Sequence, residues 1–269
     1  MNTVITHFHN EEYILPWWIN HHKKIFDYGI MINYASTDRS LEICKELCPS
    51  HWKIVESVNE KFDPYTNDTE VKVHEQSVEG FKITLTATEF LLIPFHLDEI
   101  NRFLLDRGIH YLKTWGVCMV DTDPHNLPTY DRPLFEQKNH GIISGYYGPL
   151  SMSPDPAHGH VIEPFDQLYG RHYHNQPFGK YGGGRHSVQS DEVINVGDIF
   201  TLKFKYCPWN KIYIDRLKNY EIVKNKFDTA SYVSSDDDHN EMYKHYLKYA
   251  HDLLDNHSFK KAYFYTLGL

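Results

Sequence analysis

The sequence predicts an α/β fold with a mostly parallel sheet flanked by helices. Three short segments rich in β-branched or apolar residues lie at 3–6, 29–32 and 52–56, and two segments of helical periodicity separate them. The connections are short, and polar residues follow the first two segments. This alternation is typical of βαβ units with right-handed crossovers. At 269 residues the chain can bury a large core, and we expect a single domain.

Composition argues against two classes of partner. The formal net charge of -9 is unfavourable for nucleic acid, because phosphate binding needs a basic surface that releases counterions. No run approaches the roughly eighteen apolar residues of a membrane span, and no basic, then apolar, signal opens the chain. We therefore expect a cytoplasmic protein without a transmembrane segment. Cys44 and Cys48 lie one helical turn apart, which is more typical of buried thiols than of a disulfide or zinc site.

The first helix is predicted from residue 11 to about residue 26. Acidic residues favour its N-terminal end, and apolar residues recur at helical spacing until Gly29 ends it and opens the second strand. A second helix is expected over 39–48, capped by the residues 36–38 and closed by Pro49. The third strand is expected over 52–56.

The rest of the chain is less regular. Residues 59–70 are polar and predict a loop, followed by a helix over 71–81, a strand over 82–86 that leads into 87–92, a helix over 98–107 and a buried strand over 116–120. The stretch 124–200 is rich in Pro and Gly and predicts long loops, which in a compact domain usually carry function. A strand over 200–204 and a terminal helix over about 240–254 complete the prediction.

Polar side chains gather where the predicted strands end. Ligands of open α/β sheets bind outside the carboxyl ends of the strands. Carbonyl, carboxylate and hydroxyl groups there can hold a nucleotide by its base and ribose. Helix capping by residues 36–38 is the alternative that needs no ligand. The candidates after the first two strands are His9, Asn10, Glu12, Asn33, Ser36 and Asp38.

The stretch from Val4 to Ser40 resembles the opening of glycosyltransferase family 2 and its relatives of the GT-A fold. The resemblance is carried by Asn10-Glu11-Glu12 after the first strand and by Ser36-Thr37-Asp38-Arg39-Ser40 after the second. Many family members have two aspartates where this chain has Asn33-Tyr34. The resemblance implies a glycosyltransferase of the hexosyltransferase type that moves a sugar from a nucleotide-diphosphate sugar to a hydroxyl of a saccharide or glycoconjugate acceptor, with inversion. Residues 1–123 would form the donor-binding core of the single domain 1–269, and residues 124–269 the acceptor side.

Family members also carry an Asp-x-Asp motif after a later strand, where it binds a divalent metal on the sugar diphosphate. One subgroup writes this motif Asp-x-Asp-Glu-Phe-Leu. The matching stretch here is Thr86-Ala87-Thr88-Glu89-Phe90-Leu91, in which threonine replaces both aspartates. Glu89 keeps a carboxylate for a sugar hydroxyl or a metal, although as the cap of a turn it needs no ligand.

Asp121-Thr122-Asp123 is the literal Asp-x-Asp of the chain, and it follows a predicted buried strand. We expect Asp121 and Asp123 to hold Mn or Mg. Alternatively, either acid orients the acceptor or acts as the catalytic base. A turn before Pro124 favours Asp without any ligand.

Two later segments supply further candidates. A Gly-rich run lets backbone N–H groups approach an anion, and Arg185 or Lys180 beside it would complete a clamp on the diphosphate. In GT-A enzymes a histidine from this region completes the metal shell, which points to His186 or His174. Asp238, in an acidic run near the C-terminus, is a candidate base for an inverting transfer, with helix capping as the alternative.

Two rival functions stay open. Nineteen histidines and the pairs His7/His9, His158/His160 and His172/His174 suggest a His-rich metal-dependent hydrolase, because alternating imidazoles can grip zinc. Such a barrel would need eight strand and helix repeats, and only about five can be read. A catalytically inactive carbohydrate-binding protein of the GT-A fold is the other rival, and the threonines at 86 and 88 favour it.

Overall fold

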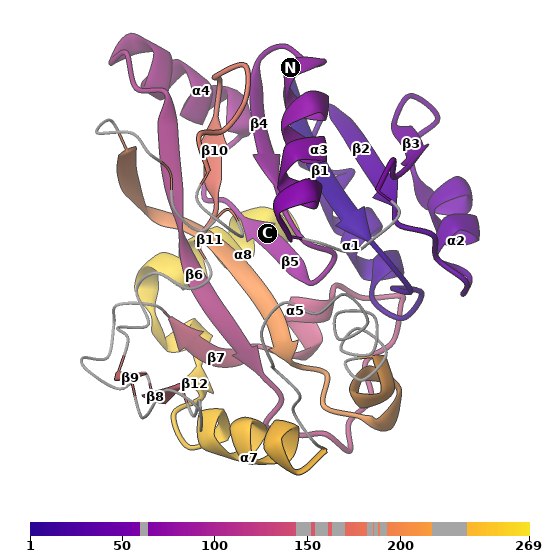
Figure 1. Cartoon of the computed structure of the whole chain (residues 1–269). Helices are drawn as coiled ribbons and strands as arrows, with labels where there is room; N and C mark the ends of the chain where they lie inside the picture. Colours follow the sequence, from indigo (N-terminus) through magenta and orange to yellow (C-terminus); the bar gives the residue numbers. More distant parts are fainter. Residues whose placement is uncertain are drawn as a thin grey trace.

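A computed structural model describes residues 1–59, 64–143, 152–153, 161–162, 170–181, 185, 188, 193–216 and 236–269. A ten-stranded mixed sheet forms its centre (Figure 1). Along the main path its strands are β12 (His251–Asp252), β7 (His140–Ile143), β6 (Tyr111–Val120), β10 (His172–His174), β4 (Phe81–Thr84), β1 (Asn2–Phe8), β2 (Tyr28–Asn33) and β3 (Lys53–Glu56). Off this path, β11 (Val193–Tyr206) pairs with β6 and with β5 (Glu89–Leu92). A separate ribbon joins β8 (Met152–Ser153) to β9 (Val161–Ile162).

The N-terminal half of the sheet is parallel. β1 lies between β2 and β4, and Ile5 is paired with Ile30 on one side and with Thr84 on the other. Side chains alternate between the two faces of the strands. Val4 therefore packs with α1 (Leu15–His22) and α2 (Ser40–Leu47), whereas Ile5 faces Val71 of α3 (Pro64–Gln76). Helices on both faces of parallel strands confirm the predicted α/β class.

The other half of the sheet is mostly antiparallel. β10 runs antiparallel to both of its neighbours, while β11 runs parallel to β6, and these two long strands cross the middle of Figure 1 side by side. α8 (His257–Leu267) covers one face, where Phe259 meets Phe200 with ring centroids 5.4 Å apart. α7 (Asp236–Leu247) supplies Tyr246, which stacks on Tyr206 at 4.8 Å. The remaining helical elements are α4 (Leu97–Asp106), α5 (Leu134–Gln137) and the 3-10 turn η3 (Leu253–Asp255).

Several predicted boundaries are wrong. α3 begins at Pro64, inside the expected loop, because proline is well suited to the first turn of a helix, where its missing N–H is not needed. The expected helix over 240–254 ends at Leu247, and a separate helix, α8, follows. Asn256 caps α8 by accepting a hydrogen bond from the Phe259 amide at 2.9 Å, and Gly268 ends it in the left-handed conformation at φ 78°. The expected loops of 124–200 contain α5, β7 and β10.

In the part of the chain that the structure describes, no helix has both the length and the apolar character needed to cross a membrane.

Candidate functional site

Asn10 joins the loops that follow β1 and β2. Its side-chain Oδ1 accepts hydrogen bonds from the backbone amides of Thr37 at 2.7 Å and Asp38 at 3.3 Å, and its own backbone amide donates to Ser36 Oγ at 3.1 Å. Asn10 has φ 52° and Ala35 has φ 44°, in the left-handed region that residues other than glycine rarely adopt. Such backbone persists where the surrounding structure enforces it, and it clusters at binding sites. The two groups of residues predicted to converge therefore do lie together.

Two side chains predicted to bind the nucleotide form hydrogen bonds within the protein instead. Asn33 donates from Nδ2 to Glu56 Oε2 at 2.7 Å and accepts the Ser36 amide at 3.2 Å. Asp38 accepts the Glu12 amide at 3.0 Å and the amide of the first residue of α2 at 2.9 Å. Both side chains hold the shape of the loops. Their direct contact with a nucleotide stays a prediction.

The outward-facing groups of this edge are mainly acceptors. His9 Nδ1 lies 2.5 Å from the carbonyl oxygen of Tyr34, and because a carbonyl only accepts, Nδ1 donates and Nε2 is left as the acceptor of the neutral ring. The carboxylates of Glu12 and Glu56 are exposed. Glu56 was absent from the sequence-based candidates, although its place at the end of β3 follows the same rule that found the others.

We expect Asn10→Ala to lower the free energy of unfolding by about 1–3 kcal/mol, because alanine loses the side-chain hydrogen bonds and tolerates the left-handed backbone poorly. Asn10→Gly should cost less than Asn10→Ala, since glycine keeps the backbone conformation at no steric cost. Urea denaturation of both variants measures the two effects separately. Equal losses for alanine and glycine would show that the backbone conformation contributes nothing.

Glu89 is the centre of a buried ion cluster. Arg171 donates from Nε and Nη2 to the two carboxylate oxygens of Glu89 at 2.8 and 2.6 Å, and Lys203 Nζ lies 3.2 Å from Oε1. The Thr86 amide adds a bond at 2.8 Å. Burial alone would raise the pKa of Glu89, but the positive charges of Arg171 and Lys203 lower it well below the ordinary value. Binding of Glu89 to a sugar hydroxyl or a metal stays a prediction, and such binding would compete with these hydrogen bonds.

Lys203 sits opposite Glu89 in the register of β11 and β5. Its Nζ also donates to Thr86 Oγ1 at 2.7 Å, and the hydroxyls of Thr86 and Thr88 lie 3.1 Å apart. Burial and the charge of Arg171 lower the pKa of Lys203 to about 8, against the opposing influence of Glu89.

Arg216 brings a further positive charge to this edge of the sheet. It lies in the helical segment 211–216, forms a two-pronged ion pair with Glu11 and adds to the depression of the Lys203 pKa. Glu11 directly follows Asn10 in the loop after β1, so this pair links that loop to the Lys203 cluster. Sequence reasoning missed Lys203 and Arg216, because a lysine inside a strand and an arginine in a short helical segment carry no positional signal.

Asp121 is bonded as a structural anchor. Its Oδ1 accepts from Lys138 Nζ at 2.7 Å and from the Asp123 amide at 3.0 Å, and its Oδ2 accepts from the Trp209 amide at 2.9 Å. The side chains of Asp121 and Lys138 are 1% and 5% exposed, whereas Asp123 is exposed. A cation at Asp121 would have to displace a lysine ammonium.

No all-protein cage for a divalent cation is assembled in the described part of the chain. Among the described residues, no three His, Cys, Asp or Glu side chains come together. His186 lies outside the described residues, and so does the side chain of Asp238 in α7. The predicted metal site therefore lacks an assembled donor set in the described part of the chain, and we derive no step through a metal.

Arg185 packs against α3, where it forms a buried ion pair with Asp68. The histidine pairs behave as structural groups: His7 Nε2 lies 2.9 Å from Glu70, and His174 Nε2 lies 2.7 Å from the Tyr181 hydroxyl in the interior. His158 and His160 lie outside the described residues. In the described part of the chain, these contacts therefore provide no zinc site for the hydrolase hypothesis.

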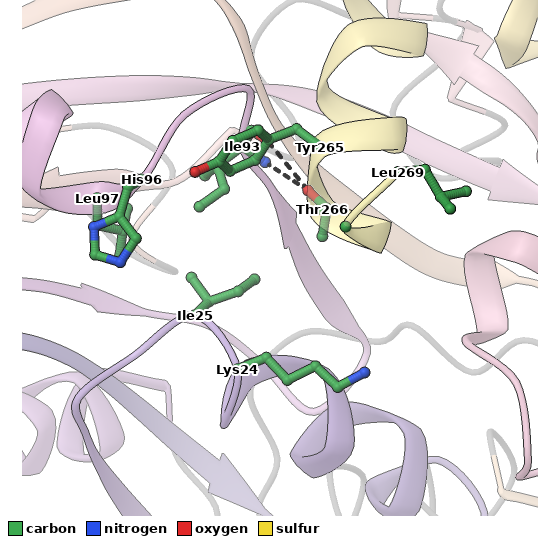
Figure 2. Close-up of a pocket in the computed structure, with 9 residues that line it drawn as sticks. Lys24, Ile25, Ile93, His96, Leu97, Tyr265, Thr266 and Leu269 are labelled. Atoms are coloured by element: carbon green, nitrogen blue, oxygen red, sulfur yellow. Dashed lines mark hydrogen bonds between the residues drawn. The ribbon is translucent and has the colours of Figure 1, made fainter.

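A cavity of about 440 Å³ opens elsewhere (Figure 2). Lys24 and Ile25 line it where the chain enters β2, and the end of α8 closes its other side with Tyr265 and Leu269. This position is at the opposite end of β2 from Asn33. None of the predicted site residues lines the cavity.

No protein-family model and no curated protein sequence matches the chain. Among solved structures, it is similar to glucosyl-3-phosphoglycerate synthase from Mycobacterium tuberculosis, with 16% identity over 43% of this chain and 44% of that one and a TM-score of 0.32. Core-mannan synthase A from Aspergillus fumigatus gives 14% identity, 48% and 44% coverage and a TM-score of 0.29. A putative glucose-1-phosphate thymidylyltransferase from Bacillus anthracis gives 8% identity over 47% of this chain and 57% of that one, with a TM-score of 0.31.

These likenesses are partial. The chain spans about half the length of the solved proteins it matches, and each match covers less than half of this chain. The α/β class rests on the strand order and helices of the chain itself.

Proposed function

We propose that the protein is a glycosyltransferase that binds a nucleotide-diphosphate sugar at the carboxyl edge of β1, β2 and β3 and passes the sugar to a saccharide hydroxyl. The observation that carries the proposal is the pair of loops joined by Asn10, with two residues in the left-handed conformation and exposed carboxylates beside them. The resemblance of residues 4–40 to glycosyltransferase family 2 supports it. Hexosyl specificity, inversion, the division at residue 123 and a cytoplasmic location belong to the same proposal.

The donor half of the site follows from the chemistry of the groups present. The carboxylates of Glu12 and Glu56 accept hydrogen bonds, and a nucleotide offers donors from its base edge and ribose hydroxyls. A diphosphate needs positive charge, which Lys203 brings to the same edge as the Arg216 and Glu11 ion pair. The base therefore lies over β2 and β3, and the phosphates extend towards β11.

The acceptor half needs one base to take the proton of the attacking hydroxyl. Asp121 has both carboxylate oxygens bonded within the protein. Asp123, exposed beside it, and Asp238 are therefore the candidates of choice.

Binding of a donor nucleotide is the first test. At least one of uridine, guanosine and thymidine diphosphate, at ten times its dissociation constant, should raise the melting temperature by about 3 °C or more, because ligand that binds only the folded state stabilises it by mass action. Glu56→Ala should reduce the shift. Glu42→Ala, a carboxylate exposed on α2, is the matched control and should leave it unchanged. No shift with any of the three at millimolar concentration, with or without Mn, contradicts the proposal.

A nucleotide-sugar-binding protein without catalysis is the second candidate. The threonines at 86 and 88 and the ion pair that engages Asp121 favour it. It predicts the same thermal shift without sugar transfer. Slow hydrolysis of the donor by the pure protein would exclude it.

A further inference from the structure

Tyr130 presents an aromatic ring to solvent on the loop between β6 and α5. It is 50% exposed, although its ring lies against that of Trp17 in α1, with ring centroids 4.2 Å apart. Trp17 itself is only 3% exposed. One side of the Tyr130 ring therefore packs on α1, and the remainder stays open to a ligand.

Hydrogen bonds fix the position of this exposed ring. The Tyr130 hydroxyl donates to the carbonyl oxygen of Tyr13 at 3.0 Å, and Nε1 of Trp17 donates to the carbonyl oxygen of Thr129 at 3.0 Å. Gln137 of α5 holds the same loop, because its Oε1 accepts from the Thr129 amide at 2.8 Å and its Nε2 donates to the Thr129 carbonyl oxygen at 2.8 Å. A side chain that is already ordered loses little conformational entropy when it binds a ligand.

The ring adjoins the loop that follows β1. Tyr13, whose carbonyl accepts the Tyr130 hydroxyl, directly follows Glu12, and the exposed Glu12 carboxylate belongs to the proposed donor site. Burial, with smaller contributions from Tyr13 and Glu12, raises the pKa of Tyr130 to about 12. Tyr130 therefore remains a neutral ring beside the donor edge over the whole physiological range of pH.

Tyr13 extends the aromatic surface towards Asp121. Its ring centroid lies 5.5 Å from that of Trp17, and its hydroxyl accepts from Asn210 Nδ2 at 2.8 Å. Asn210 follows Trp209, whose amide donates to Asp121 Oδ2 at 2.9 Å. The aromatic side chains thus connect the loop after β1, which carries proposed donor groups, with the turn after β6, which carries a candidate base.

A sugar ring suits a surface of this kind. The face of an aromatic ring carries partial negative charge, and the C–H groups on one face of a pyranose carry partial positive charge, so the two rings stack. The hydroxyls of the sugar need donors and acceptors around that contact. A polar cavity of about 250 Å³ opens on the same loop and is lined by Asn126, Pro128, Arg132, Glu136 and Gln137.

We propose that Tyr130, backed by Trp17 and Tyr13, is the platform on which a pyranose ring of the saccharide acceptor stacks. The proposal rests on the proposed function and deepens it, because it assigns a binding residue to the acceptor. Nucleobases also stack on aromatic rings, so the experiment has to distinguish an acceptor sugar from the base of the donor.

Saturation-transfer NMR titrations with the methyl glycosides of glucose, galactose, mannose and N-acetylglucosamine, with and without a nucleoside diphosphate, test the proposal. The wild-type protein should bind at least one glycoside. Tyr130→Phe and Tyr130→Leu are a matched pair, since both lose the hydroxyl and only phenylalanine keeps the aromatic face. Tyr130→Phe should bind within a few-fold of wild type, whereas Tyr130→Leu should raise the glycoside dissociation constant by about tenfold. Tyr265→Ala, which removes a 42% exposed tyrosine of α8, should behave as wild type.

The outcomes separate the platform from the proposed function. Equal glycoside binding by Tyr130→Leu and Tyr130→Phe, or no binding of any glycoside, overturns the platform and leaves the nucleotide site in place. Glycoside binding that depends on Tyr130 in a protein that binds no nucleoside diphosphate keeps the platform and overturns the proposed function. Nucleoside diphosphate binding that is weaker in Tyr130→Leu than in Tyr130→Phe assigns the ring to the donor base and overturns its acceptor role. Leucine keeps an apolar contact with Trp17, and melting curves check that both variants are folded.

Discussion

Replacing Glu89 with glutamine is expected to lower the free energy of unfolding by about 3–5 kcal/mol. Glu89 is fully buried, and its carboxylate accepts two bonds from Arg171 and one from Lys203. The variant removes the negative charge that Glu89 contributes to both cations, and removing one partner of a buried ion pair costs far more than the pair contributes. Urea denaturation at pH 7 measures the loss.

Two further variants show whether charge is the cause. Glu99→Gln, on the exposed side of α4, should change stability by less than about 0.5 kcal/mol. Glu89→Gln combined with Arg171→Met should recover part of the loss, because the second substitution removes one of the two cations that the Glu89 carboxylate faced. A loss below about 1 kcal/mol in the single variant contradicts the buried-cluster argument.

The same carboxylate makes stability depend on pH. Folding lowers the pKa of Glu89 below its ordinary value of 4.5. Its contribution is therefore complete above that value and is lost as the pH falls below it towards the folded pKa. The wild-type protein should lose stability in that acidic range more steeply than Glu89→Gln, which has no proton to bind there.

The elements that were predictable from sequence are those with local causes. β1, α1, β2 and α2 follow from β-branched runs, helical spacing, a glycine stop and a capping turn, all within the first fifty residues. The placement of β10 between β4 and β6 depends on partners more than fifty residues away. Periodicity within a segment carries no information about such pairing, so the antiparallel half of the sheet was not foreseen.

The candidate site divides in the same way. The loops at Asn10 and Ser36 could be found because polar residues after parallel strands have a known destination. The ion pairs of the site could not, since Glu89 and Arg171 are 82 positions apart and Glu11 and Arg216 are 205 apart. The rule that ligands bind at strand ends identifies which carboxylates lie near the site. It does not say which of them forms an ion pair with a cationic side chain from a distant part of the sequence.

Asp121 is where this distinction has the largest consequence, since the sequence offers it as a metal ligand or base and the structure pairs it with Lys138. We expect Asp121→Asn to lower the free energy of unfolding by about 3 kcal/mol, because it strands a lysine whose side chain is 5% exposed. Asp121→Asn combined with Lys138→Met should recover much of that loss, and Asp123→Asn, exposed in the same turn, should cost little.

Urea denaturation measures the stability of these variants, and a donor hydrolysis or transfer assay measures their activity. Lost activity at wild-type stability in Asp121→Asn would identify a catalytic or metal-binding carboxylate. Lost stability that the second substitution restores identifies an anchor, because a base or a metal ligand gains nothing from removal of its neighbouring lysine.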